Sequence, residues 1–285
     1  MASRNERQRA LDRAKYDRQL ARRAARARRR RQWIAGAGTA LAVLLIVAGT
    51  VYFFRGDDDG RPTGAGACGW SRLDPAANPR LKDVGTPPRE GNPTAGTTPM
   101  SINTNVGQIG VTLEQGTAPC GIASLRHLSA KGFYAGTACH ELTGDYLRCG
   151  DPSGTGEGGP TYGLLGENLP AAASGTPGPG TPAQYLRGTV ALFRTGPGTY
   201  GSQFVIVHKD IRTSDPTLSP VGYVSTNMGL VDKIVRAGTV ADAAGAKTKP
   251  ASPVTIDTLK VDDRVILPGD GAPATGAPAP SAAGR

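Results

Sequence analysis

Three side chains in this sequence are of the types that form a nucleophilic catalytic site. His140 lies in the string CHEL, Asp151 in GDP and Ser202 in GSQF. A serine activated by a histidine, which an aspartate orients, would be the chemistry of a hydrolase. However, GSQF is not a nucleophile elbow, and no motif assigns a partner to Ser202. Hydrolysis is therefore the least favoured of the functions that we consider.

Two opposite charges, Glu141 and Arg148, lie seven residues apart in the segment CHELTGDYLRCGD. The surrounding residues predict strands at 137–142 and 146–149. On neighbouring strands, Glu141 and Arg148 would form an ordinary cross-strand ion pair. Such a pair stabilises a sheet and needs no role in chemistry.

Four cysteines, Cys68, Cys120, Cys139 and Cys149, all follow a long apolar stretch. An even number of cysteines in an exported region favours two disulfides, and the sequence leaves the three pairings open. Zinc is the competing use, because Cys139 and His140 lie near Cys149. The chain has no C-x-x-C pair and few other ligands, so we expect disulfides and neither a metal nor another cofactor.

The net charge of +10 is confined to the N-terminal end of the chain. Residues 1–32 carry 13 basic and 3 acidic side chains, whereas the rest of the chain is balanced. Residues 33–54 then form an uncharged stretch of 22 residues, long enough for a transmembrane helix. The basic side chains before it place the N-terminus in the cytoplasm. A cleaved signal peptide is the alternative, but no clear A-x-A site follows.

This charge distribution predicts a single-pass protein of the cell membrane with its C-terminal part outside the cytoplasm. The basic tail, residues 1–32, is expected to contact anionic membrane lipid and not nucleic acid. Residues 55–98 are rich in Gly, Pro, Asp, Thr and Asn and are expected to be a flexible linker that buries no core. Residues 268–285 are mostly Pro, Gly and Ala and are expected to be disordered. One domain remains, at 99–267.

Within this domain the hydrophobic pattern predicts many short strands and two helices. The predicted elements are a hairpin over 101–114, a helix over 118–133, strands at 137–142, 146–149, 188–193 and 203–207, a helix over 228–238 and a closing strand over 253–263. Strands and helices do not alternate as in βαβ units. The sequence therefore predicts a mainly β (α+β) fold with an antiparallel barrel.

Three strings resemble, in the correct order, the conserved blocks of cyclophilin-type peptidyl-prolyl isomerases. They are CHELTGDYLRCGDPSGTGEGGPTYG, RGTVALFRTGPGTYGSQFVIV and VGYVSTNMGLVDKIVRAG. The resemblance covers residues 101–261. With the basic tail, the apolar stretch and the external cysteines, the chain is similar to the membrane-anchored cyclophilins of actinobacteria. This resemblance implies an eight-stranded antiparallel barrel capped by two helices.

The resemblance also implies a reaction without a covalent intermediate. Rotation about a peptide bond costs about 18 to 20 kcal/mol, and an X-Pro bond takes tens of seconds or more to isomerise by itself. Cyclophilins use an Arg that donates toward the prolyl nitrogen, an apolar proline pocket, and amide side chains that hold the flanking carbonyls. Proline-containing exported polypeptides are the implied partners, and a cyclosporin-type ligand is implied as a further ligand of the pocket.

Several family positions carry over to this chain. Gln203 of GSQF is retained. Tyr146 stands where the family usually has its pocket Phe, and Leu147 where it has Met or Leu, and both are expected to contact proline. Val205 replaces an aromatic residue, which would make the pocket floor shallower.

Other positions depart from the family pattern. Phe193 and Arg194 replace an Ala and an Asn, and Leu218 stands in place of a His or aromatic residue on the pocket rim. The largest departure is Glu141, which takes the place of the catalytic Arg, while Arg148 replaces a Gln. We therefore predict Arg148, Glu141 and Gln203 as catalytic residues.

Loss of one preorganised donor commonly costs about 2.7 to 4 kcal/mol of transition-state stabilisation. Activity should therefore be weak unless Arg148 or Arg194 supplies the missing donor. A binding module that grips peptides without turnover is the alternative function, because the fold does not choose between the two.

Overall fold

The computed structural model describes residues 66–242 and 244–268. The predicted basic tail at 1–32, transmembrane helix at 33–54 and almost all of the tail at 268–285 lie outside these residues. Within the described part of the chain, no helix combines the length and the apolar character that crossing a bilayer requires. The membrane anchor therefore stays a prediction.

The first long elements are the hairpin strands β3 (Thr97–Thr104) and β4 (Gly107–Glu114). Their register places Ile102 opposite Ile109, and buried and partly exposed residues alternate along β3. This alternation is the period of a sheet with one face on the core. The predicted hairpin is confirmed, and it begins four residues earlier than expected.

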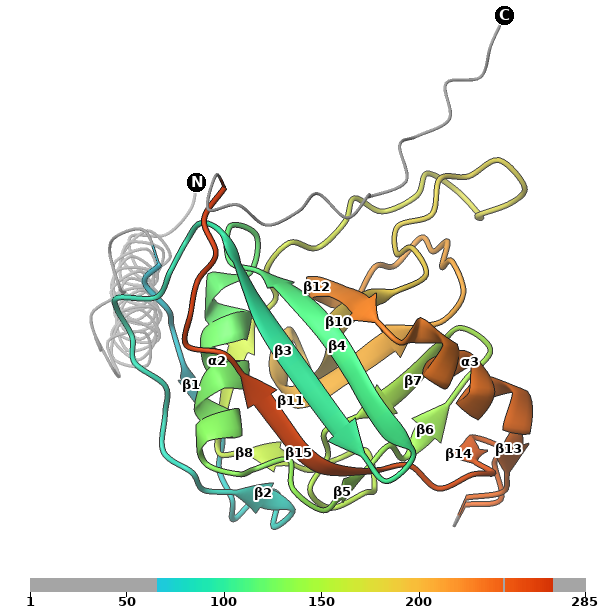
Figure 1. The fold of residues 1–285 in the computed structure, drawn as a ribbon, viewed down its shortest axis with the longest axis horizontal. Helices are drawn as coiled ribbons and strands as arrows, with labels where there is room; N and C mark the ends of the chain where they lie inside the picture. Colours follow the sequence, from blue (N-terminus) through green and yellow to red (C-terminus); the bar gives the residue numbers. More distant parts are fainter. Residues whose placement is uncertain (1–65, 243, 269–285) are drawn as a thin grey trace, which may run out of the picture. The chain divides into compact units, whose positions relative to one another are not determined.

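The main sheet is antiparallel and mostly made of non-consecutive strands (Figure 1). Its strands lie side by side in the order β1 (Ser71–Arg72), β9 (Tyr162–Leu165), β11 (Thr199–Val207), β10 (Thr189–Gly196), β12 (Ser219–Thr226), β4, β3, β15 (Thr255–Val261) and β5 (Thr137–Ala138). Strand β7 (Tyr146–Cys149) also pairs with β11, and it pairs on its other side with β6 (Glu141–Leu142).

The mainly β fold is thus confirmed, but the eight-stranded closed barrel is not. Among the described residues the sheet has 11 strands, and its hydrogen-bonded path does not return to its start. The predicted strand at 137–142 is wrong as one element, because it divides into β5, which pairs with β15, and β6, which pairs with β7. Strands β9 and β12 are not among the strands predicted from the sequence.

Both predicted helices are present, α2 (Pro119–Ala130) and α3 (Met228–Ala237), and they lie at opposite sides of the sheet in Figure 1. Helix α2 begins with Pro119, whose fixed φ and missing N–H suit the first helical turn. It buries Ile122, Leu125 and Leu128 in the main core. Two small ladders complete the fold: β2 (Leu81–Lys82) with β8 (Gly159–Pro160), and β13 (Thr239–Val240) with β14 (Lys249–Pro250).

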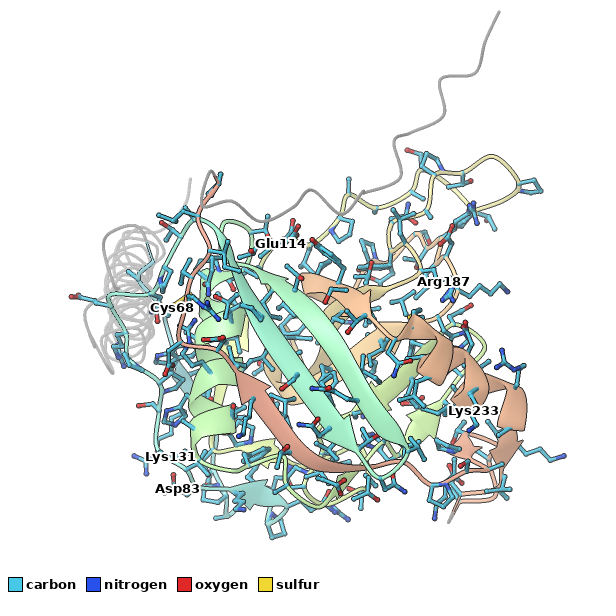
Figure 2. All side chains as sticks on the ribbon, in the orientation of Figure 1. Cys68, Asp83, Glu114, Lys131, Arg187 and Lys233 are labelled. Atoms are coloured by element: carbon cyan, nitrogen blue, oxygen red, sulfur yellow. A yellow bond between two sulfur atoms is a disulfide. The ribbon has the colours of Figure 1, made fainter. Side chains whose placement is uncertain are left out.

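Residues 66–96, which we call the arm, pack against the domain. Cys68 forms a disulfide with Cys120 of α2, and Figure 2 shows Cys68 beside that helix. Trp70 is buried, with its ring centroid 5.5 Å from that of Tyr162. The expectation that residues 55–98 bury no core is therefore wrong for the described part of that segment.

The second disulfide joins Cys139 and Cys149. Both predicted bridges are thus present, and the structure selects one of the three pairings that the sequence left open. The zinc alternative is wrong, because the two sulfurs that it needs are bonded to each other.

Candidate functional site

Arg148 lies at the centre of a polar cluster, which it forms with Glu141, Gln203 and the Gly156 carbonyl. The cluster lies on the face of the sheet that points away from the main core. On β7 it is directly opposite Glu141 of β6 on one side and Val205 of β11 on the other. Residues that are directly opposite in a ladder point to the same face, and so do residues two apart on one strand. Gln203 therefore shares this face with Arg148 and Glu141.

The guanidinium of Arg148 is held by three hydrogen bonds. Nη1 donates to Glu141 Oε2 at 2.7 Å, Nε donates to Gln203 Oε1 at 2.8 Å, and Nη2 donates to the Gly156 carbonyl at 2.7 Å. The side chains of Arg148 and Glu141 are only 11% and 23% exposed. The ion pair is thus much better shielded from water than a typical surface pair.

An aromatic ring covers the guanidinium. The Arg148 Cζ lies 3.9 Å from the centroid of the Phe193 ring, which is a cation–π contact. The ring of Tyr146 lies beside that of Phe193, with centroids 6.1 Å apart. Burial, and next the charge of Glu141, raise the pKa of the Tyr146 hydroxyl, so it stays neutral at physiological pH.

A small apolar cluster adjoins these polar groups on the same face. It contains Tyr185, Ala191, Val205, Val207 and Leu218, and Tyr146 and Phe193 pack against it. The hydroxyl of Tyr185 donates to the Leu218 carbonyl at 2.9 Å and so fixes the segment before β12. The five members are at most 5% exposed, so the apolar surface next to Arg148 is that of the half-buried rings of Tyr146 and Phe193. A cationic donor beside such rings suits a ligand that has a carbonyl or amide next to an apolar ring.

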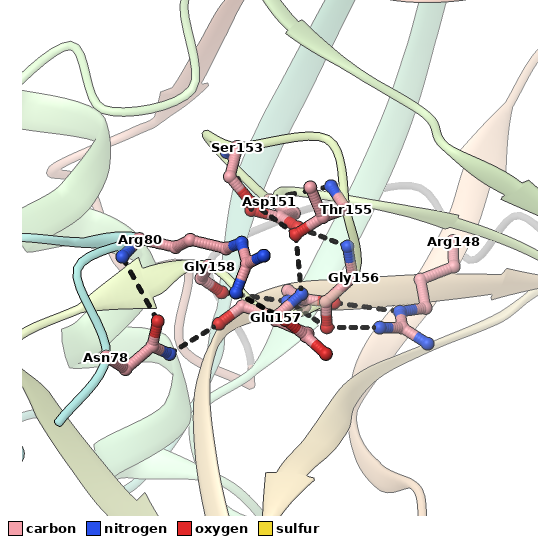
Figure 3. A network of polar contacts seen from close by, with 10 residues as sticks. Asn78, Arg80, Arg148, Asp151, Ser153, Thr155, Gly156, Glu157 and Gly158 are labelled. Carbon is pink, nitrogen blue, oxygen red and sulfur yellow. Dashed lines mark hydrogen bonds and ion pairs between the residues drawn. The ribbon is translucent and has the colours of Figure 1, made fainter. Parts of the chain in front are cut away.

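The loop after β7, residues 151–158, supplies the backbone acceptors of the cluster, and we call it the acceptor loop. Gln203 Nε2 donates to the carbonyls of Gly156 at 3.0 Å and Gly158 at 2.8 Å. Asp151 organises this loop by accepting from Ser153 and from the Gly156 N–H (Figure 3). Burial alone would raise the pKa of Asp151, but these hydrogen bonds lower it below its ordinary value.

Comparison with known proteins identifies the domain. The family profile of the cyclophilin type peptidyl-prolyl cis-trans isomerases matches residues 99–261, more than half of the chain. The chain belongs to the cyclophilin family. A relative named probable peptidyl-prolyl cis-trans isomerase B from Mycobacterium tuberculosis is 34% identical over 194 residues, which is 66% of this chain and 60% of that protein. The relative of the same name from Mycobacterium leprae is 36% identical over 196 residues, 66% of this chain and 65% of that protein.

These matches therefore span somewhat less than two thirds of the length of each mycobacterial relative. Among solved structures, a cyclophilin type peptidyl-prolyl cis-trans isomerase from Cryptosporidium parvum is similar, with a TM-score of 0.46 and 21% identity. That comparison covers 59% of this chain and 99% of the other.

The cyclophilin fold brings most of the predicted site residues together. Seven of them meet in the polar cluster or in the apolar cluster beside it: Glu141, Tyr146, Arg148, Phe193, Gln203, Val205 and Leu218. Their catalytic and binding roles remain predictions. Val205 and Leu218 are 0% and 5% exposed, so they lie beneath the site and present no surface to a substrate.

Two predicted contacts lie elsewhere in the cyclophilin domain. Leu147 is 1% exposed and belongs to the main core, because it points to the opposite face from Arg148. As a substrate contact it is wrong. Arg194 is exposed and follows a register shift of β10, where it lies opposite Tyr200. The structure does not bring Arg194 to the polar cluster.

The hydrolase interpretation fails on geometry. Ser202 is fully buried, and its hydroxyl donates to the Gly150 carbonyl at 2.7 Å. The carboxylate of Asp151 is engaged by its own loop. Burial, followed by the nearby charge of Arg148, lowers the pKa of His140 to about 4, so this imidazole is neutral near pH 7. The three side chains therefore do not form a nucleophilic triad.

Sequence reasoning missed the acceptor loop as a part of the site. The signal was present in its glycines. Gly156 has a φ of +89°, which L side chains rarely adopt, and a Cβ there would lie 2.9 Å from Arg148 Nη2. Only glycine allows this close approach between the loop and the guanidinium.

A cavity of about 260 Å³ lies farther along the same face of β11, past Gln203. Its lining includes Thr199 and Gly201 of β11, together with Gly158 and Gly159. The arm contributes Leu73, Ala77 and Leu81 to its lining. The cavity, the polar cluster and the apolar cluster thus lie in sequence along one strand.

Proposed function

We propose that this protein is a peptidyl-prolyl cis-trans isomerase in which Arg148 donates to the amide that rotates. The observation that carries the proposal is the position of the Arg148 guanidinium. It lies between Glu141 and Gln203 and beside the half-buried rings of Tyr146 and Phe193, whose apolar faces suit a proline ring. Proline-containing polypeptides are the proposed substrates.

The arginine retains donors for this role. A guanidinium has five N–H bonds, and three of those of Arg148 are used within the protein. For the second N–H of Nη1 and of Nη2, the described residues provide no further acceptor. As the amide twists, its nitrogen regains a lone pair and becomes an acceptor. A donor aimed at that nitrogen stabilises the transition state more than the ground state, which is the condition for catalysis.

Peptide binding without turnover is the second candidate, and the ring of Phe193 favours it. The ring lies 3.9 Å from the guanidinium, so a substrate amide must displace it or approach from its edge. If the ring stays in place, it would still be able to hold a peptide together with the ring of Tyr146. Catalysis therefore requires that Phe193 moves aside or that the amide reaches Arg148 past the edge of the ring.

The cellular context belongs to the same proposal. The apolar stretch at 33–54, the basic tail that precedes it and the two disulfides support a location outside the cytoplasmic membrane, with anionic lipid at the tail. Exported polypeptides would then be the substrates. A cyclosporin-type ligand is expected to bind beside Arg148, and we expect no nucleic acid partner.

The test is a protease-coupled prolyl isomerisation assay on the full chain in detergent. Arg148→Ala should reduce the catalysed rate by about 100-fold or more, the usual effect of losing a preorganised donor. Arg194→Ala is the matched control, since Arg194 lies away from the cluster, and it should leave the rate unchanged. An inert wild type that binds the proline peptide would overturn catalysis and support the binding module.

A further inference from the structure

The arm reaches the site through the acceptor loop, although residues 66–96 lie outside the part of the chain that matches the cyclophilin profile. Its two short strands hold the segment that follows the loop. Strand β2 pairs with β8, with Leu81 beside Gly159, and strand β1 pairs with β9, with Ser71 beside Gly163. The segment 159–163 is thereby held by the arm at both of its ends.

One arm side chain, Asn78, bonds directly to the acceptor loop. Its Nδ2 donates to the carbonyl of Glu157 at 2.8 Å, while its Oδ1 accepts from the N–H of Arg80 at 3.1 Å (Figure 3). Both ends of the amide are therefore engaged, which fixes its orientation. Asn78 lies half-buried between the arm and the loop.

Arg80 also contacts the loop, through an ion pair of 2.7 Å with the carboxylate of Glu157. The two side chains are 47% and 65% exposed, and pairs this exposed contribute little. The Asn78 bond is exposed as well, but it holds the loop backbone itself, whereas the ion pair holds only the Glu157 side chain.

The carbonyl that Asn78 holds lies between two carbonyls that serve the site. Gly156 O accepts from both Arg148 and Gln203, and Gly158 O accepts from Gln203. Successive carbonyls of the loop thus point alternately to the site, the arm and the site. A rotation of the Glu157 peptide would move both acceptors of the site, so Asn78 restrains them through one bond.

We propose that Asn78 is a positioning residue, and that the arm sets the orientation of Arg148 by fixing the acceptor loop. The effect of Asn78 on the isomerisation rate rests on the proposed function, whereas its effect on the position of Arg148 does not. Without the bond from Asn78, the Gly156 carbonyl would sample other directions. Arg148 would then keep its Glu141 partner, but its Nη2 and the Gln203 amide would lose their fixed acceptor.

The test compares Asn78→Ala with the wild type, and Glu90→Ala serves as the control because Glu90 is exposed on the same arm. The first readout is the ¹⁵N NMR signal of the Arg148 Nη2–H, which donates to the Gly156 carbonyl, and its rate of exchange with water, in the full chain in detergent. We expect Asn78→Ala to shift this signal and to speed its exchange about fivefold, the effect of one ordinary hydrogen bond. Glu90→Ala should change neither.

The second readout is isomerisation. Asn78→Ala should lower kcat about fivefold with little change in KM, because Arg148 acts on the transition state. An unchanged Arg148 signal in Asn78→Ala would overturn the positioning role. Should Asn78→Ala fail to fold, Asn78→Asp replaces it. This variant keeps the side-chain volume and the acceptor for Arg80 but loses the donor to Glu157. It should shift the Arg148 signal and lower kcat as Asn78→Ala does. If the wild type is inert while the signal still shifts, the proposed function fails and the positioning role stands.

Discussion

The ion pair between Glu141 and Arg148 offers a quantitative test of the site. Two unit charges about 4 Å apart interact by about 4 kcal/mol at the effective dielectric constant of about 20 that suits partly buried groups. Part of this energy offsets the desolvation of both groups. With side-chain exposures of only 11% and 23%, we expect a net coupling of about 1.5 to 3 kcal/mol. An exposed pair would give about 0.2 to 1 kcal/mol.

The measurement is a double-mutant cycle of Glu141→Gln, Arg148→Gln and the two together. Urea unfolding at pH 7 gives the free energy of unfolding of each variant. A second cycle on a more exposed ion pair serves as the comparison. Arg187 and Asp232 provide it, because they bond at 2.8 Å and their side chains are 42% and 33% exposed. A coupling below about 0.5 kcal/mol for Glu141 and Arg148 would contradict the interpretation of a shielded pair.

Three further experiments test the ring of Phe193, the Cys68–Cys120 disulfide and the titration of His140. Phe193→Ala removes the ring over Arg148, so it should lower the free energy of unfolding by about 1 to 2 kcal/mol. Because the ring also covers the guanidinium, the same variant should raise kcat/KM several-fold. A lower kcat/KM would show that the ring belongs to the active arrangement. Replacing both Cys68 and Cys120 by Ser opens a loop of 52 residues, so it should cost up to about 4 kcal/mol, measured as a lower urea midpoint. His140 has a pKa of about 4 in the folded chain against 6.5 when unfolded, so the unfolded state binds more protons and stability falls as pH drops from 6.5 to 4. His140→Asn should remove this pH dependence of the free energy of unfolding, which amounts to no more than about 3 kcal/mol. Urea titrations at several pH values measure it, and an unchanged pH dependence would contradict the prediction.

The parts of the fold that the sequence predicts well are those with a strong hydrophobic period. The hairpin β3–β4 and the helices α2 and α3 each bury one face, and each was expected within a few residues of its bounds. The arm was missed because its strands are two residues long and its anchors are a disulfide and one Trp. Such contacts depend on distant residues and leave no period in the sequence.

The sequence predicts the parts of the site that are made of side chains but not the parts that are made of backbone carbonyls. Glu141 and Arg148 were expected to pair, because their types and strand positions suggested it. The placement of Leu147 was avoidable, since adjacent strand residues point to opposite faces and Leu147 cannot share the face of Arg148. The carbonyls of Gly156 and Gly158 have no side-chain signature, so only the structure reveals them as acceptors of the site.

The most direct test of the central claim is the rate of cis–trans exchange of a proline peptide, measured by NMR exchange spectroscopy with and without the full chain. We predict that the wild type accelerates exchange, that Arg148→Lys loses most of the acceleration because an ammonium cannot reproduce the guanidinium fork, and that Arg194→Lys does not. An acceleration that survives in Arg148→Lys and Arg148→Ala would contradict the role that we assign to Arg148.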